Sequence, residues 1–324
     1  MPSPRLTIVP LEAGDVAALL AQLPTQPGVA QVLGPDGQSL LIGRPANVRR
    51  WVAAQLGAGP APKKGMRPPT NLAPITSAVA FAATTTPFAQ RLAFERVMGR
   101  HVPLSKRRDL KPPVYLHLDP AARFPRLVVR PGEGDREHLY GPFRSRPAAQ
   151  SAIEALHALF PLRPCDFVFE PAPDLALGLG CVFAQVRTCS APCLQRVTED
   201  DYRALAGRAA AVLGAGARRA PELAAAMPSW VTAVAQGRGL VMDRTGATVE
   251  LYPVLAGAVV EEAMASTTMD GLEEAVAALR WPEPSPPRDD TRWLLPWLHG
   301  KRTGTYLDLA PGEPATAISE RLRA

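Results

Sequence analysis

All four cysteines of this 324-residue chain fall within one short segment, at Cys165, Cys181, Cys189 and Cys193, with the spacing C-x15-C-x7-C-x3-C. Four soft thiolates gathered from one loop-rich segment are the usual ligands of a [4Fe–4S] cluster or of a structural zinc ion. Two disulfides, or four inert buried thiols, are the alternatives. Disulfides need an oxidising compartment, and the start of the chain leads into no long apolar run of the secretory type. The sequence therefore favours a metal centre.

Positive charge is concentrated in residues 44–130, although the whole chain carries a net charge of only +6. This stretch contains sixteen lysines and arginines, and its only acidic residues are Glu95, Asp109 and Asp119. A local excess of this kind is typical of a protein that binds a polyanion. The alternative is a solvated surface whose arginines pair with the acidic remainder of the chain. We favour nucleic acid, with candidate DNA contacts at Arg44, Arg49, Arg50, Lys63, Lys64, Lys106, Arg107 and Arg108.

The elements that would position these residues follow from apolar spacing and turn residues. Gly34-Pro35-Asp36-Gly37 is typical of a hairpin turn between short strands at 29–33 and 39–42. Thr198 and Asp270 are predicted helix N-caps. Helices are predicted at 15–23, 47–56, 88–98, 147–160, 199–213 and 271–279, with a last helix or turn at 293–298. Further strands are predicted at 114–118, 127–129, 240–242 and 249–254. No segment approaches about 18–20 apolar residues, so we expect no membrane span.

Several runs of residues around the cysteines match a known family. They are Phe124-Pro125-Arg126-Leu127-Val128-Val129, Tyr140-Gly141-Pro142-Phe143, Leu159-Phe160-Pro161-Leu162-Arg163-Pro164-Cys165 and Cys189-Ser190-Ala191-Pro192-Cys193. Together they resemble the UvrC excinuclease family, the dual-incision nucleases of bacterial nucleotide excision repair. The resemblance implies a [4Fe–4S] cluster on the four cysteines and a cytoplasmic location. It also implies DNA as a partner, as damaged or branched duplex, together with other excision-repair proteins.

The N-terminal part resembles the GIY-YIG nuclease module of the same family, with Pro27-Gly28-Val29-Ala30 and Leu41-Ile42-Gly43-Arg44 at the two motifs. In such a site, tyrosines position the attacking water, an arginine stabilises the developing charge, and a glutamate holds a divalent metal ion.

This chain departs from that pattern at most catalytic positions. Ala30 and Leu41 stand where the family has tyrosines, and Trp51 stands where the family has arginine, with Arg50 one position away. Glu95 is the only carboxylate on the predicted 88–98 helix. Arg50 and Glu95 are therefore the remaining candidate catalytic residues, and the resemblance implies a largely inactive site.

We expect an α+β chain in three parts. These are a degenerate GIY-YIG-like sheet-and-helix domain at 1–100, a linker and four-cysteine α/β region at 101–213, and a small α/β domain of unknown role at 214–324. The predicted function is that of a UvrC-like DNA-binding protein with a cluster and without nuclease activity. The alternatives are a weak nicking endonuclease that uses Mg²⁺ or Mn²⁺, and a structural module that binds another protein.

Overall fold

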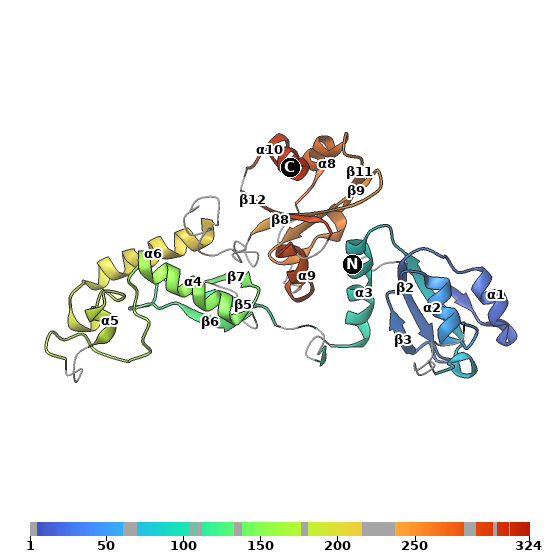
Figure 1. The fold of residues 1–324 in the computed structure, drawn as a ribbon, viewed down its shortest axis with the longest axis horizontal. Helices are drawn as coiled ribbons and strands as arrows, with labels where there is room; N and C mark the ends of the chain where they lie inside the picture. Colours follow the sequence, from blue (N-terminus) through green and yellow to red (C-terminus); the bar gives the residue numbers. More distant parts are fainter. Residues whose placement is uncertain are drawn as a thin grey trace. The chain divides into compact units, whose positions relative to one another are not determined.

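The computed structural model describes residues 5–60, 70–103, 106–107, 110, 112–132, 138–175, 181–215, 237–281, 290–300, 303–310 and 312–324. Helices and antiparallel sheets are combined in it, as expected for an α+β chain (Figure 1). Contacts between residues group the chain into two compact units: 1–109 together with 243–250, and 110–242 together with 251–324.

The first unit is built on a four-stranded antiparallel sheet in the order β1-β4-β2-β3. The strands are β1 (Thr7–Pro10), β2 (Gly28–Leu33), β3 (Ser39–Gly43) and β4 (Ala78–Ala83). The predicted hairpin between β2 and β3 is confirmed. Its turn is closed by a hydrogen bond of 2.9 Å from the Gly37 N–H to the Gly34 carbonyl, with Gly37 at φ 71°, a backbone angle that glycine adopts without steric cost.

Helices cover both faces of this sheet (Figure 1). They are α1 (Val16–Ala21), α2 (Val48–Gln55) and α3 (Pro87–His101), and short 3-10 turns lie at Glu12–Gly14 and Ala73–Ile75. Ala30 of β2 belongs to the buried cluster of Val48 and Val52 on α2, whereas the preceding Val29 packs with Val97 of α3. Since successive strand residues point to opposite faces, α2 and α3 lie on opposite sides of the sheet.

The second unit contains the cysteines and a three-stranded antiparallel sheet in the order β6-β5-β7. Its elements are β5 (Val114–His117), β6 (Val128–Pro131), β7 (Leu139–Phe143), α4 (Arg146–Leu159), α5 (Val182–Gln185), the 3-10 turn η4 (Pro192–Leu194) and α6 (Glu199–Ala215). One apolar core joins Leu116 of the sheet, Leu156 of α4 and Tyr202 of α6. The predicted cap of α6 is confirmed, because the Thr198 hydroxyl accepts a hydrogen bond from the Asp201 N–H at 3.1 Å.

The C-terminal part of the chain forms a five-stranded sheet in the order β10-β9-β8-β12, with β11 paired to β9. Its elements are β8 (Arg238–Thr245), β9 (Thr248–Leu255), β10 (Ala258–Val259), a 3-10 turn at Glu261–Ala263, β11 (Ala265–Thr267), α8 (Leu272–Ala278), α9 (Thr291–Leu298), β12 (Thr305–Leu309) and α10 (Ala315–Arg323). The prediction that Asp270 caps α8 is wrong. The helix begins one residue later, with Gly271 at the N-cap and no side-chain cap.

Within the described ranges, no helix has both the length and the apolar character that crossing a membrane requires.

Candidate functional site

The four cysteines of the second unit lie on loops and turns around α5 and η4. Cys181 is the N-cap of α5, Cys193 lies within η4, and Cys189 lies on the loop between these two elements. All four thiols are unpaired, so the structure gives no support to the disulfide interpretation. Cys189 and Cys193 are each only 7% exposed, while Cys165 and Cys181 are half-buried.

The backbone of this segment adopts an unusual number of left-handed conformations. Among the described residues, six non-glycine residues have positive φ, and three of them are Arg187 (59°), Ala191 (54°) and Gln195 (52°). Such a conformation costs about 1–2 kcal/mol for an L-residue and is concentrated at functional sites. At Ala191 it directs the backbone N–H to the sulfur of Cys189, at 3.3 Å. Hydrogen bonds to cysteine sulfur are among the features that tune metal-bound thiolates.

The thiols influence one another electrostatically. The pKa of Cys189 is raised to about 11, mainly by burial and in smaller part by the nearby Cys165, Cys181 and Cys193, while the hydrogen bond from the Ala191 N–H lowers it. Burial also raises the pKa of Cys193. Without a cation these buried thiols are therefore protonated at neutral pH. Across the described ranges, no three His, Cys, Asp or Glu side chains are already arranged as a metal site. The donor set thus has the chemistry of a metal centre and shares one neighbourhood, without forming a closed cage.

Tyr202 of α6 fixes the loop that leads into Cys165. Its hydroxyl accepts a hydrogen bond from the Arg163 N–H at 2.7 Å and donates one to the Pro125 carbonyl at 3.0 Å. The Arg163 side chain continues this connection, because it donates to the carbonyls of Phe124 and Phe167. A buried tyrosine thereby joins three separate stretches of chain next to the first cysteine.

Replacing Tyr202 by phenylalanine is expected to lower the free energy of unfolding by about 1–3 kcal/mol, because two backbone groups lose their partner in a buried place. The matched control is Tyr140→Phe. Tyr140 is also buried, at 7% exposed, but its hydroxyl has no hydrogen bond to the described residues. Urea-induced unfolding measures both variants. Equal losses from the two would contradict the bridging role of Tyr202.

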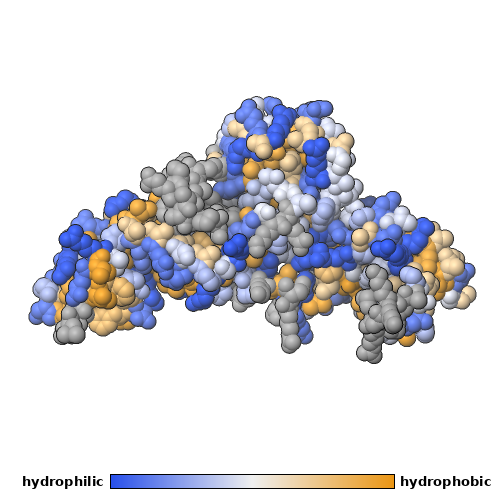
Figure 2. Space-filling model, viewed as in Figure 1, coloured by the Kyte–Doolittle hydropathy of each residue, from blue (hydrophilic) through white to orange (hydrophobic). Residues whose placement is uncertain are grey.

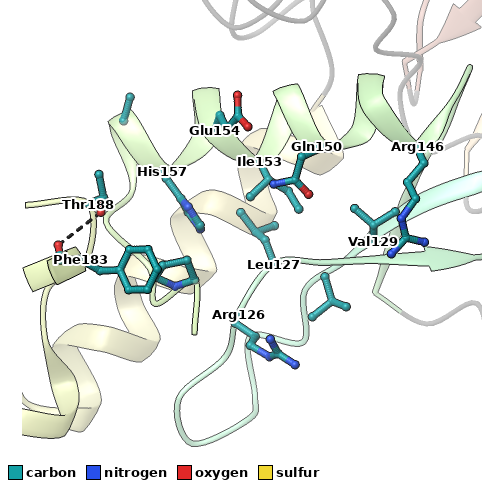
Figure 3. A pocket seen from close by; sticks show the side chains of 13 residues that line it. Arg126, Leu127, Val129, Arg146, Gln150, Ile153, Glu154, His157, Phe183 and Thr188 are labelled. Atoms are coloured by element: carbon teal, nitrogen blue, oxygen red, sulfur yellow. Dashed lines mark hydrogen bonds between the residues drawn. The ribbon is translucent and has the colours of Figure 1, made fainter. Parts of the chain in front are cut away.

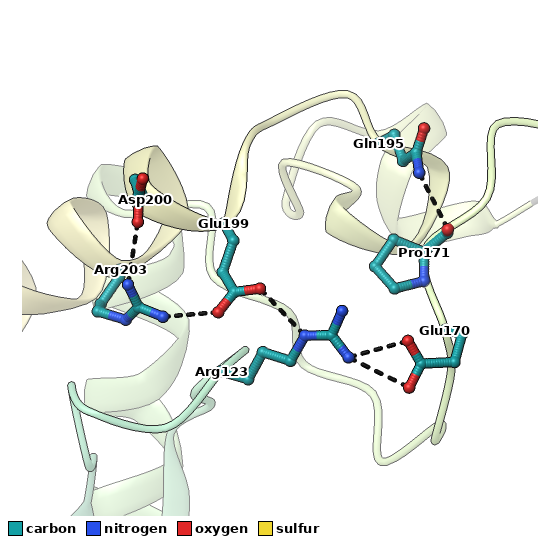
Figure 4. Close-up of polar contacts among 7 residues, drawn as sticks. All are labelled: Arg123, Glu170, Pro171, Gln195, Glu199, Asp200 and Arg203. Carbon is teal, nitrogen blue, oxygen red and sulfur yellow. Dashed lines mark hydrogen bonds and ion pairs between the residues drawn. The ribbon is translucent and has the colours of Figure 1, made fainter.

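An exposed charge network ties a second loop to the start of α6 (Figure 4). Arg123 donates to Glu170, in the loop between the first two cysteines, at 2.9 Å, and to Glu199 at 3.0 Å. Arg203 pairs with Glu199 and Asp200 on the helix itself. Exposed ion pairs stabilise a fold only slightly, so the network orients this loop more than it stabilises the unit.

In the first unit, apolar packing surrounds Ala30 and Leu41, the two positions at which the sequence predicts that the tyrosines of a GIY-YIG site are replaced. Ala30 is fully buried and pairs with Gly43 across the sheet, and Leu41 packs against the same core. The Trp51 ring lies so close to Gly43 that a Cβ there would come within 2.4 Å of it. Neither Ala30 nor Leu41 has a group that could hold a water molecule or move a proton.

The structure does not bring the two candidate catalytic residues together. Glu95 lies on α3 with its side chain 5% exposed, and its carboxylate pairs with Arg91 and with Arg107 at 3.0 Å. Arg50 is exposed on α2, and α2 covers the opposite face of the sheet. The Glu95 oxygens are therefore held by guanidinium groups within the fold.

The candidate DNA contacts fall into three groups. Arg44, Arg50 and Lys106 are exposed, and the Arg44 guanidinium lies 5.8 Å from the centre of the Phe94 ring. Arg49 donates to the carbonyls of Ala21, the last residue of α1, and of Leu23 just after it, whereas Arg107 is buried against Glu95. Lys63, Lys64 and Arg108 lie outside the described residues.

The predicted DNA contacts left out three arginines of the second unit, on or beside its sheet and at the start of α4. Arg130 and Arg146 are exposed and Arg126 is half-buried. The run Phe124 to Val129, already noted for its family resemblance, was the signal that could have identified Arg126.

Comparison with known families gives a match that covers the described sheet and cysteine segment. The model of the UvrC/Cho excinuclease middle domain matches residues 113–212. This stretch runs through β5 to α6 and includes all four cysteines, so the family resemblance around them is confirmed at the level of this domain.

Curated relatives match over a longer stretch than this domain. UvrABC system protein C of Methylococcus capsulatus is 27% identical over 197 residues, which are 59% of this chain and 30% of the relative. The protein of the same name from Brucella suis is 30% identical over 214 residues, which are 64% of this chain and 33% of the relative. That from Rhodospirillum rubrum is 31% identical over 210 residues, which are 63% of this chain and 31% of the relative. The chain therefore spans about a third of the length of the curated relatives it matches. No solved structure matches the chain significantly.

Proposed function

We propose that this chain is a DNA-binding protein of the nucleotide excision repair type, with a [4Fe–4S] cluster in its middle segment and no cleavage by its N-terminal unit. The observation that carries the proposal is that one UvrC/Cho middle-domain match contains all four cysteines, and that all four are unpaired. Damaged or branched duplex DNA is the proposed ligand, and other excision-repair proteins are the proposed partners.

The ligand chemistry supports an iron–sulfur cluster on Cys165, Cys181, Cys189 and Cys193. Soft thiolates select Fe–S clusters or zinc over harder metal ions. Bound iron would keep the buried thiols of Cys189 and Cys193 deprotonated, and the Ala191 N–H already points at one of these sulfurs. The cluster would hold together loops that have little apolar core of their own. Zinc is the alternative metal, and colour distinguishes the two, because a [4Fe–4S] protein is brown and a zinc protein is colourless.

Exposed positive charge supports DNA binding in both units. Arg44, Arg50 and Lys106 are exposed in the first unit, and Arg130 and Arg146 in the second. Arginine and lysine contacts to phosphates supply most of the sequence-independent affinity of proteins for DNA. Binding of this type depends strongly on salt and needs no contact to base edges.

The first unit supports binding without cleavage. Ala30 and Leu41 provide no proton-transfer group, Glu95 is engaged by Arg91 and Arg107, and Arg50 lies on the other face of the sheet. Loss of a single catalytic group of this kind costs about 10²–10⁴ in rate, and here several are replaced.

We expect the anaerobically purified protein to leave bubble, flap and intact duplex DNA uncut in Mg²⁺ or Mn²⁺, as followed with end-labelled strands. The Arg50→Ala variant, purified in the same way, distinguishes nicking by this protein from nicking by a contaminating nuclease. Metal-dependent nicks that disappear in this variant would establish the nicking endonuclease instead. Nicks of equal rate in both preparations would come from a contaminant.

A further inference from the structure

A groove on the middle segment of the second unit is not explained by the proposed cluster. It lies between α4, the stretch Arg126–Val129 and the residues that follow Cys181, and Phe183 and Thr188 mark its far end (Figure 3). Its volume of about 520 Å³ is within the range of about 300–1,000 Å³ that is typical of small-molecule sites. None of the cysteines lines it.

Apolar side chains of Leu127, Ile153 and Phe183 line one section of the groove, here called the slot. Leu127 and Ile153 form its buried floor at 5% and 6% exposed, and the Phe183 ring is 37% exposed. His157 lies at the same end as Phe183 (Figure 3). The Nε2 atom of His157 is buried and has no hydrogen-bond partner in the described part of the chain. Burial also lowers the pKa of His157, so that its ring is neutral near pH 7. A buried, unsatisfied ring nitrogen is costly, and a ligand with a polar edge would satisfy it.

Positive charge marks the rest of the groove. Arg126 and Arg146 line it, and neither forms an ion pair with a described residue. Glu154 is the only carboxylate among the lining residues, and in Figure 3 it points away from the Leu127 side. Gln150 adds an amide between Arg146 and His157 (Figure 3). The groove therefore offers an aromatic surface, hydrogen-bonding groups and two guanidinium groups to one ligand.

Further apolar side chains are exposed beside this end of the groove. In the region of α5, Figure 2 shows them on the surface, and Val182 and Val186 are 57% and 61% exposed. They do not line the groove, so they provide comparison positions for the test below.

We propose that this groove binds one unpaired nucleotide of a DNA strand. The base stacks on Phe183 and places its polar edge at His157 and Gln150, while the flanking phosphates pair with Arg126 and Arg146. Aromatic stacking accepts any base, because every base has a π face. An acidic peptide would satisfy the arginines but would leave the slot beside Phe183 without a flat partner. The inference rests on the DNA binding proposed above and specifies the structure that is preferred: a duplex with an extruded base.

The test uses the full, cluster-loaded chain and three duplexes of one sequence. One is fully paired, one carries a single unpaired 2-aminopurine, and one carries an abasic site at the unpaired position. We expect the unpaired base to be bound about fivefold or more tightly than the abasic site, with a change in 2-aminopurine emission on binding. Equal affinity for these two duplexes would overturn the groove assignment but leave DNA binding intact. No affinity for any of the three would overturn both.

Two variants locate the effect. Phe183→Ala is expected to abolish the preference for the base, whereas Val182→Ala, at an exposed position on the same helix and outside the groove, is expected to retain it. Arg146→Gln is expected to weaken both unpaired duplexes more than the paired one. Absorbance of the cluster verifies that each variant is loaded. If Phe183→Ala still prefers the unpaired base over the abasic site, the proposal is overturned. It is also overturned if an acidic peptide displaces the duplex with the unpaired base and binds as tightly as that duplex.

Discussion

Replacing Cys193 by serine is expected to remove the cluster from this protein. A [4Fe–4S] cluster on Cys₄ needs all four thiolates, and a serine oxygen is a harder, poorer ligand for iron. Iron content should fall from about four atoms per chain to below one. The strained turn at Ala191, which directs its N–H at Cys189, then loses the bound group that would stabilise it. Iron and acid-labile sulfide analysis of anaerobically purified protein, with the absorption near 400 nm, measures the effect.

The same loop provides a matched control in Ser190. Its hydroxyl is buried and has no hydrogen-bond partner among the residues that the structure describes, so Ser190→Ala should leave both iron content and stability nearly unchanged. Full iron content in Cys193→Ser would contradict the assigned ligand set. If the wild-type protein is colourless and contains one zinc ion, the metal assigned to these cysteines is zinc instead of iron.

Glu95→Ala is expected to destabilise the first unit by about 3–5 kcal/mol, because it removes a carboxylate that pairs with buried positive charge. The Arg107 side chain is only 4% exposed, and both its ion pair and that of Arg91 end on this carboxylate. The free energy of unfolding, from urea denaturation followed by circular dichroism, measures the loss. If Glu95 were instead a metal ligand in an open site, Glu95→Ala would cause little loss of stability and a loss of DNA cleavage.

Two further variants test the origin of this loss. Glu12→Ala removes an exposed carboxylate from the same unit and should change stability by less than about 0.5 kcal/mol. The double variant Glu95→Leu with Arg107→Met removes both charges of the pair and should recover much of the stability lost in Glu95→Ala. A double variant less stable than the single one would show that the ion pair is not the cause.

Elements with strong local signals could be predicted from the sequence. The turn at residues 34–37 has glycine where φ must be positive, α2 and α4 have clear helical spacing, and Thr198 caps α6 as expected. Strand β4, which lies between β1 and β2, was not predicted. It consists of Ala78–Ala83, mostly alanine, whose strand propensity is low, and only pairing with two neighbouring strands makes it a strand. The Asp270 cap failed because an N-cap residue also needs the helix to start directly after it.

Among the candidate functional residues, too, some could be proposed from local sequence and others depend on the folded structure. Residue type and spacing alone suggest the four cysteines as metal ligands, and this assignment stays a prediction. The ion pairs of Glu95 with Arg91 and Arg107 depend on tertiary packing around α3, and a glutamate in a basic stretch looks the same in sequence whether it is buried or open. The groove at His157 was also beyond prediction, since α4, the run before β6 and the residues after Cys181 meet only in the folded unit.

The most direct test of DNA binding without cleavage is the affinity of the cluster-loaded chain for a bubble duplex between about 50 and 200 mM KCl, in the presence of Mg²⁺. We predict an intact duplex and an affinity that falls at least about tenfold over this range. Arg50→Ala should reduce the slope of log affinity against log salt by about one, while Arg208→Ala, an exposed arginine on α6, should not. Weak, salt-independent binding would contradict the account and favour a module that binds another protein.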